Sequence, residues 1–562
     1  MDILTIQTYF QTAFQISILK EKQSPDNWWD LTGVRNLHER LKMFKQVLFL
    51  IFIVFSFPAG VGFSQTAGPL LNYEISIPQP ASHTYQINLR TSGWNEDTLQ
   101  FKMPNWMPGY YQMMEYSKTV EGMLAKDMNE NNISVEKIND NTWSIAGIKN
   151  KSFIVSYTIR TNRQFVANSY VDNTHAYLIP ENSFLYVEGF LQTPVSVKIV
   201  MNPEWKKIAT GLETVAGKSN EFMASDFDIL YDCPILIGNL EELPSFRVKG
   251  IEHRFIGYAM GDFDRVLFMD NLKKVVETAV TLMGDIPYKQ YTFIGIGPGR
   301  GGIEHLNNTT ISFDGSGLNT PNGLTRMMSF IGHEYFHHYN VKRIRPFELG
   351  PFDYDRGNKT NQLWVSEGLT VYYEYLIVKR AGLMDSQTLF SQFDENINAV
   401  ENNPGRLYQS LAQASYNTWN DGPFGTQGVE PGKSISYYDK GPVVGLFLDL
   451  EIRNATNNKK SLDDVMRLLY WKYYKQEQRG FTEAEFQQAC EQVAGIPLTS
   501  LFEYVYTTKE LDYAKYLGYV GLKIDKQTDD PSDSKKTQKR MISRIEYPTP
   551  LQAAILNSWL GE

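Results

Sequence analysis

The stretch SFIGHEYFHHYNVKRIRP, Ser329 to Pro346, holds three of the eight histidines in the 562-residue chain. His333 and His337 are the first and last residues of an H-E-x-x-H pattern. The apolar residues around them predict a half-buried helix over about residues 324–340. Residues four apart lie on the same face of a helix, so the two imidazoles can bind one metal ion. Glu334, one residue along, suits a general base that acts on water beside such an ion.

A catalytic zinc site takes three protein ligands and leaves a fourth position for water, so a third ligand is needed. Glu367 lies in LWVSEGLT, near the start of a second predicted helix at about residues 363–380. Its apolar flank and the glycine that follows favour it as that ligand. The competing carboxylates are those of Asp353, Asp355 and Glu374.

Composition narrows the class of protein. Hydrophobic residues make up 42% of the chain and charged residues 21%, values that indicate a folded globular protein of several domains. The net charge is −9 and no long basic run occurs, so we expect no nucleic-acid partner. The two cysteines, Cys233 and Cys490, have no metal-type spacing, and we expect two free buried thiols.

A secretory signal peptide is predicted at residues 43–64. Lys45 is followed by an apolar run and then by the small residues of a cleavage site. We expect the natural start at Met43, with residues 1–42 as a non-native extension and a mature chain that begins near Gln65. The protein would then be secreted or periplasmic, with a membrane contact only through this segment if it stays uncleaved.

The rest of the chain divides by its patterning into three parts. Alternating apolar and polar residues separated by Asn, Asp and Gly turns predict an antiparallel β-sandwich at residues 68–243. Helical spacing dominates residues 244–515, where further helices are expected at about residues 441–455 and after a capping box of Thr482 and Glu485. The remaining residues, 516–562, are too few for a comfortable independent core. The fold class is therefore multidomain α+β.

The motifs together resemble the glycyl aminopeptidase family of the gluzincins, over most of the mature chain. The resemblance rests on HEYFHHYNVKRIRP with LWVSEGLT, on MPNWMPGYY (Met103–Tyr111), on GGIEHLN (Gly301–Asn307) and on YYDKGPVVGLFLDLEIR. It implies a thermolysin-like catalytic domain and one zinc ion, held by His333, His337 and Glu367. It also implies that residues 516–562 are the first part of a PDZ domain that then stops.

The same resemblance implies further site residues. A tyrosine hydroxyl of the YYDKG motif, that of Tyr438, is expected to face the developing oxyanion, with Tyr437 as its rival. Glu304 is expected to bind the substrate's α-amine, and Gly301 and Gly302 let the peptide backbone approach closely.

The predicted function is therefore an extracytoplasmic zinc aminopeptidase acting on peptides, with small N-terminal residues such as glycine or alanine as plausible substrates. Two alternatives stay open. One is a zinc endopeptidase with the same chemistry, and the other is a non-catalytic peptide-binding protein, which would not need Glu334.

Overall fold

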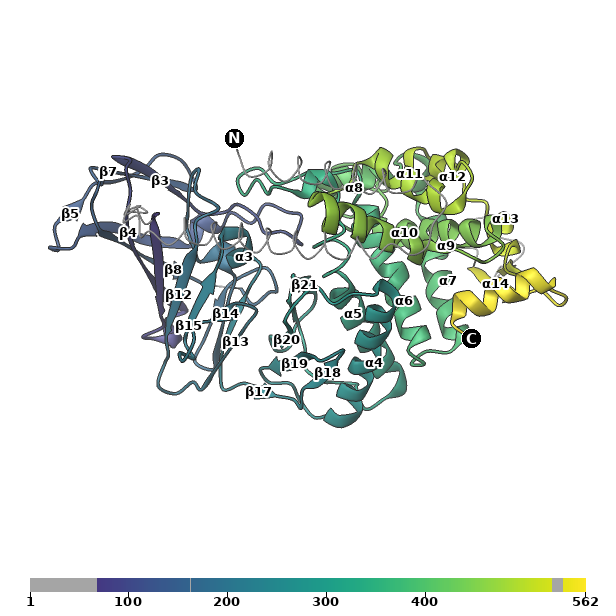
Figure 1. Cartoon of the computed structure of the whole chain (residues 1–562), viewed down its shortest axis with the longest axis horizontal. Coiled ribbons are helices and arrows are strands. Elements are labelled where there is room, and N and C mark those ends of the chain that lie inside the picture. Colours follow the sequence, from purple (N-terminus) through teal and green to yellow (C-terminus); the bar gives the residue numbers. More distant parts are fainter. Residues whose placement is uncertain (1–67, 162, 528–538) are drawn as a thin grey trace, which may run out of the picture. The chain divides into compact units, whose positions relative to one another are not determined.

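The computed structural model describes residues 68–161, 163–527 and 539–562, and these described residues belong to one compact unit (Figure 1). The predicted signal peptide and the extension before it lie outside the described residues. Within the described ranges, no helix combines the length and apolar character needed to span a membrane.

The first part of the described chain is rich in strands, drawn in purple and blue in Figure 1. The strands are β1 (Leu70–Ser76), β2 (Thr84–Ser92), β3 (Thr98–Lys102), β4 (Val120–Asp127), β5 (Asn132–Ile133), β6 (Val135–Lys137), β7 (Thr142–Ala146), β8 (Phe153–Arg160), β9 (Tyr170–Val171), β10 (His175–Leu178), β11 (Tyr186–Val187), β12 (Val195–Val200), β13 (Lys207–Thr210), β14 (Glu213–Thr214), β15 (Glu221–Ala224) and β16 (Ile235–Gly238), with one short helix, α3 (Phe227–Tyr231).

Three sheets make up this β-rich domain. The eight-stranded sheet has the order β14-β15-β12-β1-β2-β8-β4-β5, and two four-stranded sheets have the orders β13-β16-β10-β9 and β11-β3-β7-β6. The prediction of a purely antiparallel domain was wrong in one place, because β1 pairs with β12 in parallel. Those two strands are far apart in sequence, and alternation of side chains does not reveal the direction in which distant strands pair.

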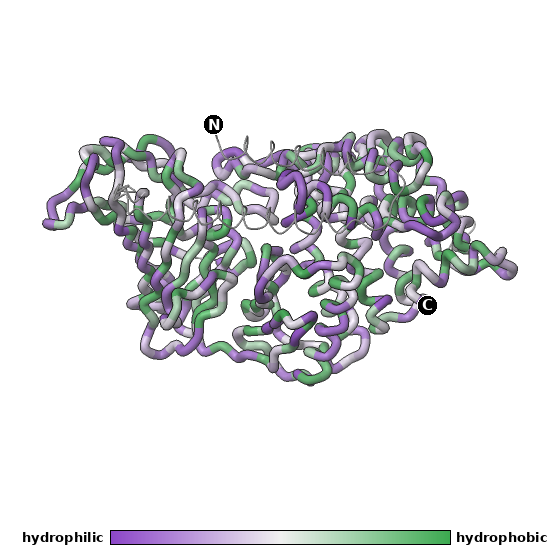
Figure 2. The backbone as a smooth tube through the Cα atoms, viewed as in Figure 1, coloured by the Kyte–Doolittle hydropathy of each residue, from purple (hydrophilic) through white to green (hydrophobic). Residues whose placement is uncertain are grey.

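Alternation along these strands produces the core of the β-rich domain. In β2, Tyr85, Ile87 and Leu89 are fully buried while the residues between them are more exposed. Figure 2 shows hydrophobic and hydrophilic residues alternating along such strands. Successive side chains of a strand point to opposite faces of the sheet, so one apolar face packs inward.

The second part combines one mixed sheet with helices. Its strands are β17 (Glu241–Glu242), β18 (Phe246–Val248), β19 (Ile251–Gly257), β20 (Gln290–Gly295), β21 (Gly302–Glu304) and β22 (Asn308–Ile311). Its helices are α4 (Arg265–Met283), α5 (Pro321–Phe336), the π-helix η5 (Trp364–Gly368), α6 (Leu369–Arg380), α7 (Ser386–Asn402), α8 (Leu411–Asp421), α9 (Tyr437–Ala455), α10 (Leu462–Leu469), the π-helix η7 (Tyr470–Glu477), α11 (Glu483–Ala494), α12 (Thr499–Tyr506) and α13 (Tyr513–Gly518).

Capping residues explain where the helices of the site begin. Thr320 caps α5 by accepting a hydrogen bond from the amide of Gly323, and Pro321 occupies the first helical turn. Ser436 caps α9 in the same way through the amide of Tyr438, so α9 begins four residues earlier than predicted. The predicted capping box of Thr482 and Glu485 is present at the start of α11.

The C-terminal residues form a hairpin and one helix: β23 (Leu522–Gln527), β24 (Lys539–Arg544) and α14 (Pro550–Leu560). Ile542, Ile555 and Trp559 belong to the same hydrophobic core as helices α5, α6 and α9. This agrees with the expectation that the segment is too short for a core of its own. The PDZ resemblance of the segment stays a prediction.

The loop at residues 103–111, which lies between β3 and β4 of the β-rich domain, packs against the helical part. Trp106 lies in the core of the helical part and donates a hydrogen bond of 2.7 Å from Nε1 to the carbonyl oxygen of Asp353. In the other direction, Ile303 and Tyr354 pack in the core of the β-rich domain. The two parts therefore share buried contacts beside strand β21.

Candidate active site

His333, His337 and Glu367 come together as a candidate metal centre. The Nε2 atoms of His333 and His337 lie 2.9 Å apart, and Oε2 of Glu367 lies 3.7 Å from the first and 3.3 Å from the second. The side chains of His337 and Glu367 are 2% and 3% exposed, and that of His333 is 11% exposed. Among the described residues, they form the one group of His, Cys, Asp and Glu side chains with metal-binding proximity.

The outer nitrogens of both imidazoles are held by other groups. Nδ1 of His333 lies 3.1 Å from Oε2 of Glu374, and Nδ1 of His337 lies 2.7 Å from the carbonyl oxygen of Asn340. Each Nδ1 therefore carries the proton and donates it, which leaves both Nε2 lone pairs facing each other. Two such lone pairs at 2.9 Å repel unless a cation lies between them.

This donor set fits zinc. Tetrahedral coordination with zinc–nitrogen distances of 2.0–2.1 Å places neighbouring ligand atoms about 3.3 Å apart. The three separations above lie around that value. Two neutral imidazoles and one carboxylate are also a common ligand set of catalytic zinc sites.

The side chain of Glu334 lies against the backbone of strand β21. A Cβ built on Gly302 would lie 2.5 Å from Cδ of Glu334, so the backbone of β21 reaches the carboxylate only because residue 302 is glycine. Burial raises the pKa of Glu334 to about 7. A peptide lying along β21 would therefore pass directly over this carboxylate.

The two adjacent tyrosines of α9 face different groups. The hydroxyl of Tyr438 donates a hydrogen bond of 2.8 Å to Oε2 of Glu367, whereas the hydroxyl of Tyr437 lies 3.1 Å from Oγ1 of Thr418. Tyr438 is therefore the one whose hydroxyl reaches the metal centre.

Glycines bring α9 close to the π-helix that carries Glu367. A Cβ on Gly368 would lie 2.6 Å from Cα of Gly441, and a Cβ on Gly441 would lie 2.6 Å from Cα of Gly368. Tyr438 lies three residues before Gly441, so this close crossing sets the distance between its hydroxyl and Glu367. A π-helical turn such as η5 is frequent at functional sites.

Glu304 lies on β21, two residues from Gly302 and on the same face of the strand. Its side chain is buried, and Oε1 has no hydrogen-bond partner in the described chain. Gly109 approaches the same carboxylate, because a Cβ there would lie 2.8 Å from Oε2. Tyr111 lines the same cavity as Glu304, and burial, followed by the charges of Glu367 and Glu304, raises the pKa of Tyr111 well above its usual value.

The competing carboxylates of the sequence take other partners. Asp353 accepts hydrogen bonds from the amides of Asp355 and Arg356, and Asp355 forms an ion pair with Lys102. Glu374 contacts the outer nitrogen of His333 and does not face the metal position.

The remaining polar residues of the α5 region have structural roles. His338 packs among Tyr288, Tyr291 and Tyr335, and burial lowers its pKa well below the usual value. Arg343 donates a hydrogen bond to the carbonyl oxygen of His338, as expected of a residue that anchors the helix end.

Sequence reasoning did not assign Trp106, Gly109 and Tyr111 to the site. The signal was present in the motif MPNWMPGYY, which holds three aromatic residues, two prolines and one glycine within nine residues. Gly109 and Glu304 approach each other although almost two hundred residues separate them in the chain, and no local sequence pattern predicts such a contact.

Comparisons with known proteins agree with this geometry. Residues 72–239 match the Peptidase M61 N-terminal domain, and residues 326–444 match the M61 glycyl aminopeptidase domain. A comparison with curated proteins found no match.

Among solved structures, an aminopeptidase N family protein from Idiomarina loihiensis is 26% identical, with a TM-score of 0.77, over 84% of this chain and 81% of that one. An M1 zinc metallopeptidase from Deinococcus radiodurans is 11% identical, with a TM-score of 0.51, over 79% of this chain and 96% of that one, and shows the fold alone.

The two domain models describe one family, and together they match about half of the chain. The second of them includes the H-E-x-x-H motif, Glu367 and Tyr438. The chain therefore belongs to the M61 glycyl aminopeptidase family and is a metallopeptidase.

Proposed function

We propose that this protein is a zinc-dependent aminopeptidase that releases the N-terminal residue of peptides outside the cytoplasm. The observation that carries the proposal is the Glu304 carboxylate. It is buried, one oxygen lacks a partner in the described chain, and it lies on the strand that also covers Glu334.

A buried carboxylate with an unused oxygen is costly unless a cation completes it. The α-amine of a peptide is cationic or partly so near neutral pH and carries the donors that the carboxylate needs. A charge-assisted hydrogen bond at Glu304 would position the first residue with its carbonyl toward Glu334, and chains without a free amine would leave Glu304 unpaired.

Each residue of the site then has its own role in hydrolysis. A zinc ion held by His333, His337 and Glu367 supplies Lewis-acid chemistry for the peptide carbonyl and for water. Glu334 removes a proton from the attacking water and delivers a proton to the leaving amine, so that one water and one peptide bond give a free amino acid and a shortened peptide. The hydroxyl of Tyr438 donates a hydrogen bond to the carbonyl oxygen as negative charge develops on it.

The test compares free and N-acetylated substrates. Zinc-loaded wild type and Glu304→Ala are assayed with matched aminoacyl and N-acetyl-aminoacyl substrates. We expect the variant to raise KM, lower kcat and reduce kcat/KM for free-amine substrates by about 10- to 100-fold, the usual cost of a lost charge-assisted hydrogen bond. Glu96→Ala, which removes an exposed carboxylate, is the matched control.

An endopeptidase would give a different result. If wild type cleaves N-acetylated peptides as well as free ones, and Glu304→Ala reduces both equally, the aminopeptidase assignment is wrong.

The proposed location rests on the predicted signal peptide at residues 43–64. We expect secreted material to begin near Gln65, which mass spectrometry of the mature N-terminus measures. A mature chain that retains residues 1–42 would overturn both the location and the proposed start at Met43. The partners that we propose are peptide substrates, with no nucleic acid, in agreement with the acidic net charge of −9.

A further inference from the structure

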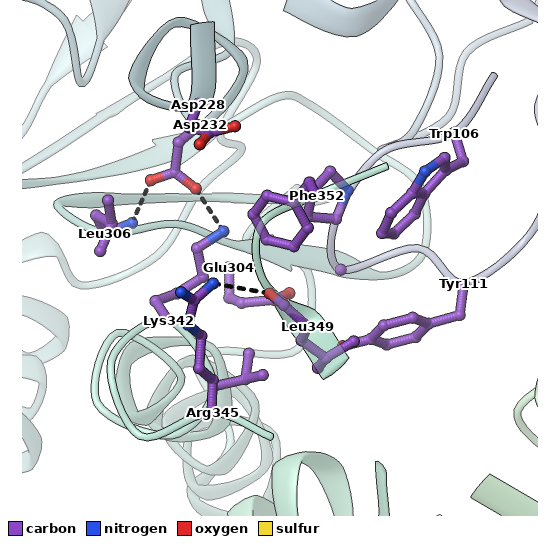
Figure 3. Close-up of a pocket in the computed structure, with 13 residues that line it drawn as sticks. Trp106, Tyr111, Asp228, Asp232, Glu304, Leu306, Lys342, Arg345, Leu349 and Phe352 are labelled. Carbon is purple, nitrogen blue, oxygen red and sulfur yellow. Dashed lines mark hydrogen bonds and ion pairs between the residues drawn. The ribbon is translucent and has the colours of Figure 1, made fainter. Parts of the chain in front are cut away.

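We propose that a cavity beside Glu304 binds the side chain of the substrate's N-terminal residue and selects bulky apolar side chains, such as those of phenylalanine and leucine. The inference rests on the proposed aminopeptidase function and names its substrate class. Figure 3 shows the residues that line this cavity.

The position of the cavity follows from Glu304. The α-amine and the side chain of an amino acid are bonded to the same carbon atom, so a side chain must lie next to the group that holds the amine. Glu304 itself lines the cavity, together with Tyr111 and with Gly109, whose backbone approaches the Glu304 carboxylate. A substrate whose amine meets Glu304 can therefore direct its first side chain into this space.

The wall of the cavity is largely apolar. Trp106 and Tyr111 come from the loop of the β-rich domain, and Leu306, Val341, Leu349 and Phe352 come from the helical part. Apolar and aromatic walls favour apolar side chains, because burial removes the surface of that side chain from water.

The other charged groups of the wall already have partners within the protein. Lys342 forms an ion pair of 2.5 Å with Asp232, and the carboxylate of Asp228 accepts a hydrogen bond of 2.6 Å from the hydroxyl of Tyr354. Arg345 donates a hydrogen bond of 2.8 Å to the carbonyl oxygen of Leu349. A charged substrate side chain would have to compete with these contacts, whereas an apolar one does not.

The volume of the cavity fits a ring or a branched aliphatic group. It measures about 160 Å³. An apolar protein cavity of about 150 Å³ is large enough to bind benzene. Glycine would leave this space unfilled, so the cavity argues for larger side chains than the glycine or alanine expected from the family resemblance.

The first experiment needs no variant. Zinc-loaded wild type is assayed with dipeptides Xaa-Ala in which Xaa is Gly, Ala, Leu, Phe, Lys or Glu, each with a free and an acetylated amine. One methylene in an apolar pocket changes kcat/KM by about 10- to 200-fold. We therefore expect kcat/KM for Leu and Phe to exceed that for Gly by at least about 100-fold, with Lys and Glu also poor.

The second experiment fills the cavity. Leu349→Phe, and separately Leu306→Phe, adds volume to the wall. Each is expected to reduce kcat/KM for Phe-Ala by at least about 10-fold relative to kcat/KM for Gly-Ala, and circular dichroism together with the zinc content shows whether the variant is folded. Leu407→Phe, at a leucine that is 55% exposed and does not line the cavity, is the matched control.

The outcomes separate this inference from the function on which it rests. A preference for Phe and Leu that the filled variants lose supports the inference. A preference for Gly or Ala among free-amine substrates overturns the inference and leaves the aminopeptidase in place. Equal cleavage of acetylated and free substrates overturns the aminopeptidase and, with it, the position of the amine from which the inference is drawn.

Discussion

The hydroxyl of Tyr438 donates a hydrogen bond of 2.8 Å to Oε2 of Glu367, so one side chain of α9 contacts a candidate metal ligand on η5. The neighbouring Tyr437 is buried and lies beside Thr418 instead. This difference separates two residues that are adjacent in sequence and chemically identical.

We expect Tyr438→Phe to lower kcat by about 10²- to 10³-fold, because we propose that this hydroxyl, which donates to Glu367 in the structure, donates to the developing oxyanion when substrate is bound. Zinc content should stay close to that of wild type, since the three ligands remain. Steady-state kinetics with metal analysis measures both quantities. Tyr437→Phe is the matched control, and equal losses in the two variants would contradict the assignment of Tyr438.

We expect Glu334→Gln to retain zinc and lose turnover. The amide has nearly the same shape but cannot accept a proton, and general base catalysis contributes about 10²- to 10⁴-fold to kcat. The exposed Glu395→Gln on α7 serves as the control. A near-native kcat in Glu334→Gln would mean that another group acts as the base.

We expect His333→Ala, His337→Ala and Glu367→Ala each to lose zinc on dialysis, as measured by elemental analysis. Glu374→Gln should weaken zinc binding by about 10- to 100-fold without abolishing it, because Glu374 orients His333 through Nδ1. Full occupancy in Glu367→Ala would show that a different residue is the third ligand.

We expect stability to fall in acid partly through His253, which lies in β19 far from the metal ligands in sequence. Burial lowers the pKa of this histidine to about 4, below the value of about 6.5 for an exposed ring. Above pH 6.5 the ring is neutral in both states and contributes no pH dependence. Between pH 6.5 and 4 the unfolded chain binds a proton that the folded chain does not, so the free energy of unfolding decreases as the pH falls.

The free energy of unfolding should therefore decrease less in His253→Gln than in wild type between pH 7 and pH 5, and the difference should be about 2 kcal/mol. Denaturant unfolding of wild type and variant at pH 7 and pH 5 measures it. The same pH dependence in both proteins would show that His253 does not contribute.

We expect Trp559→Ala to destabilise the helical part by about 3–5 kcal/mol, the usual cost of truncating a buried tryptophan. Trp559 is fully buried, stacks on Phe390 and donates a hydrogen bond of 3.0 Å to the hydroxyl of Tyr372. Thermal unfolding of the metal-loaded protein measures the change. Tyr547→Ala, at a tyrosine that is 82% exposed in the same tail, should have little effect. An unchanged transition in Trp559→Ala would show that the tail unfolds independently of the catalytic helices.

Features that depend on local spacing could be predicted from the sequence. The face shared by His333 and His337 follows from their separation of four residues, and the capping box of Thr482 and Glu485 follows from a separation of three. The alternating strands and the helical region likewise follow from patterns that repeat every two or three to four residues.

Features that depend on contacts between distant segments needed the tertiary structure. The parallel pairing of β1 with β12, the choice of Tyr438 over Tyr437 and the contact of Glu374 with His333 each join residues more than forty positions apart. The cavity beside Glu304 combines residues from the loop at 103–111, Asp228 and Asp232, and residues from 304–352. The periodicity of apolar residues indicates which face of an element is apolar, but long-range packing determines what that face contacts. The helix with His333 and His337 could therefore be predicted from the sequence, whereas the cavity beside Glu304 could not.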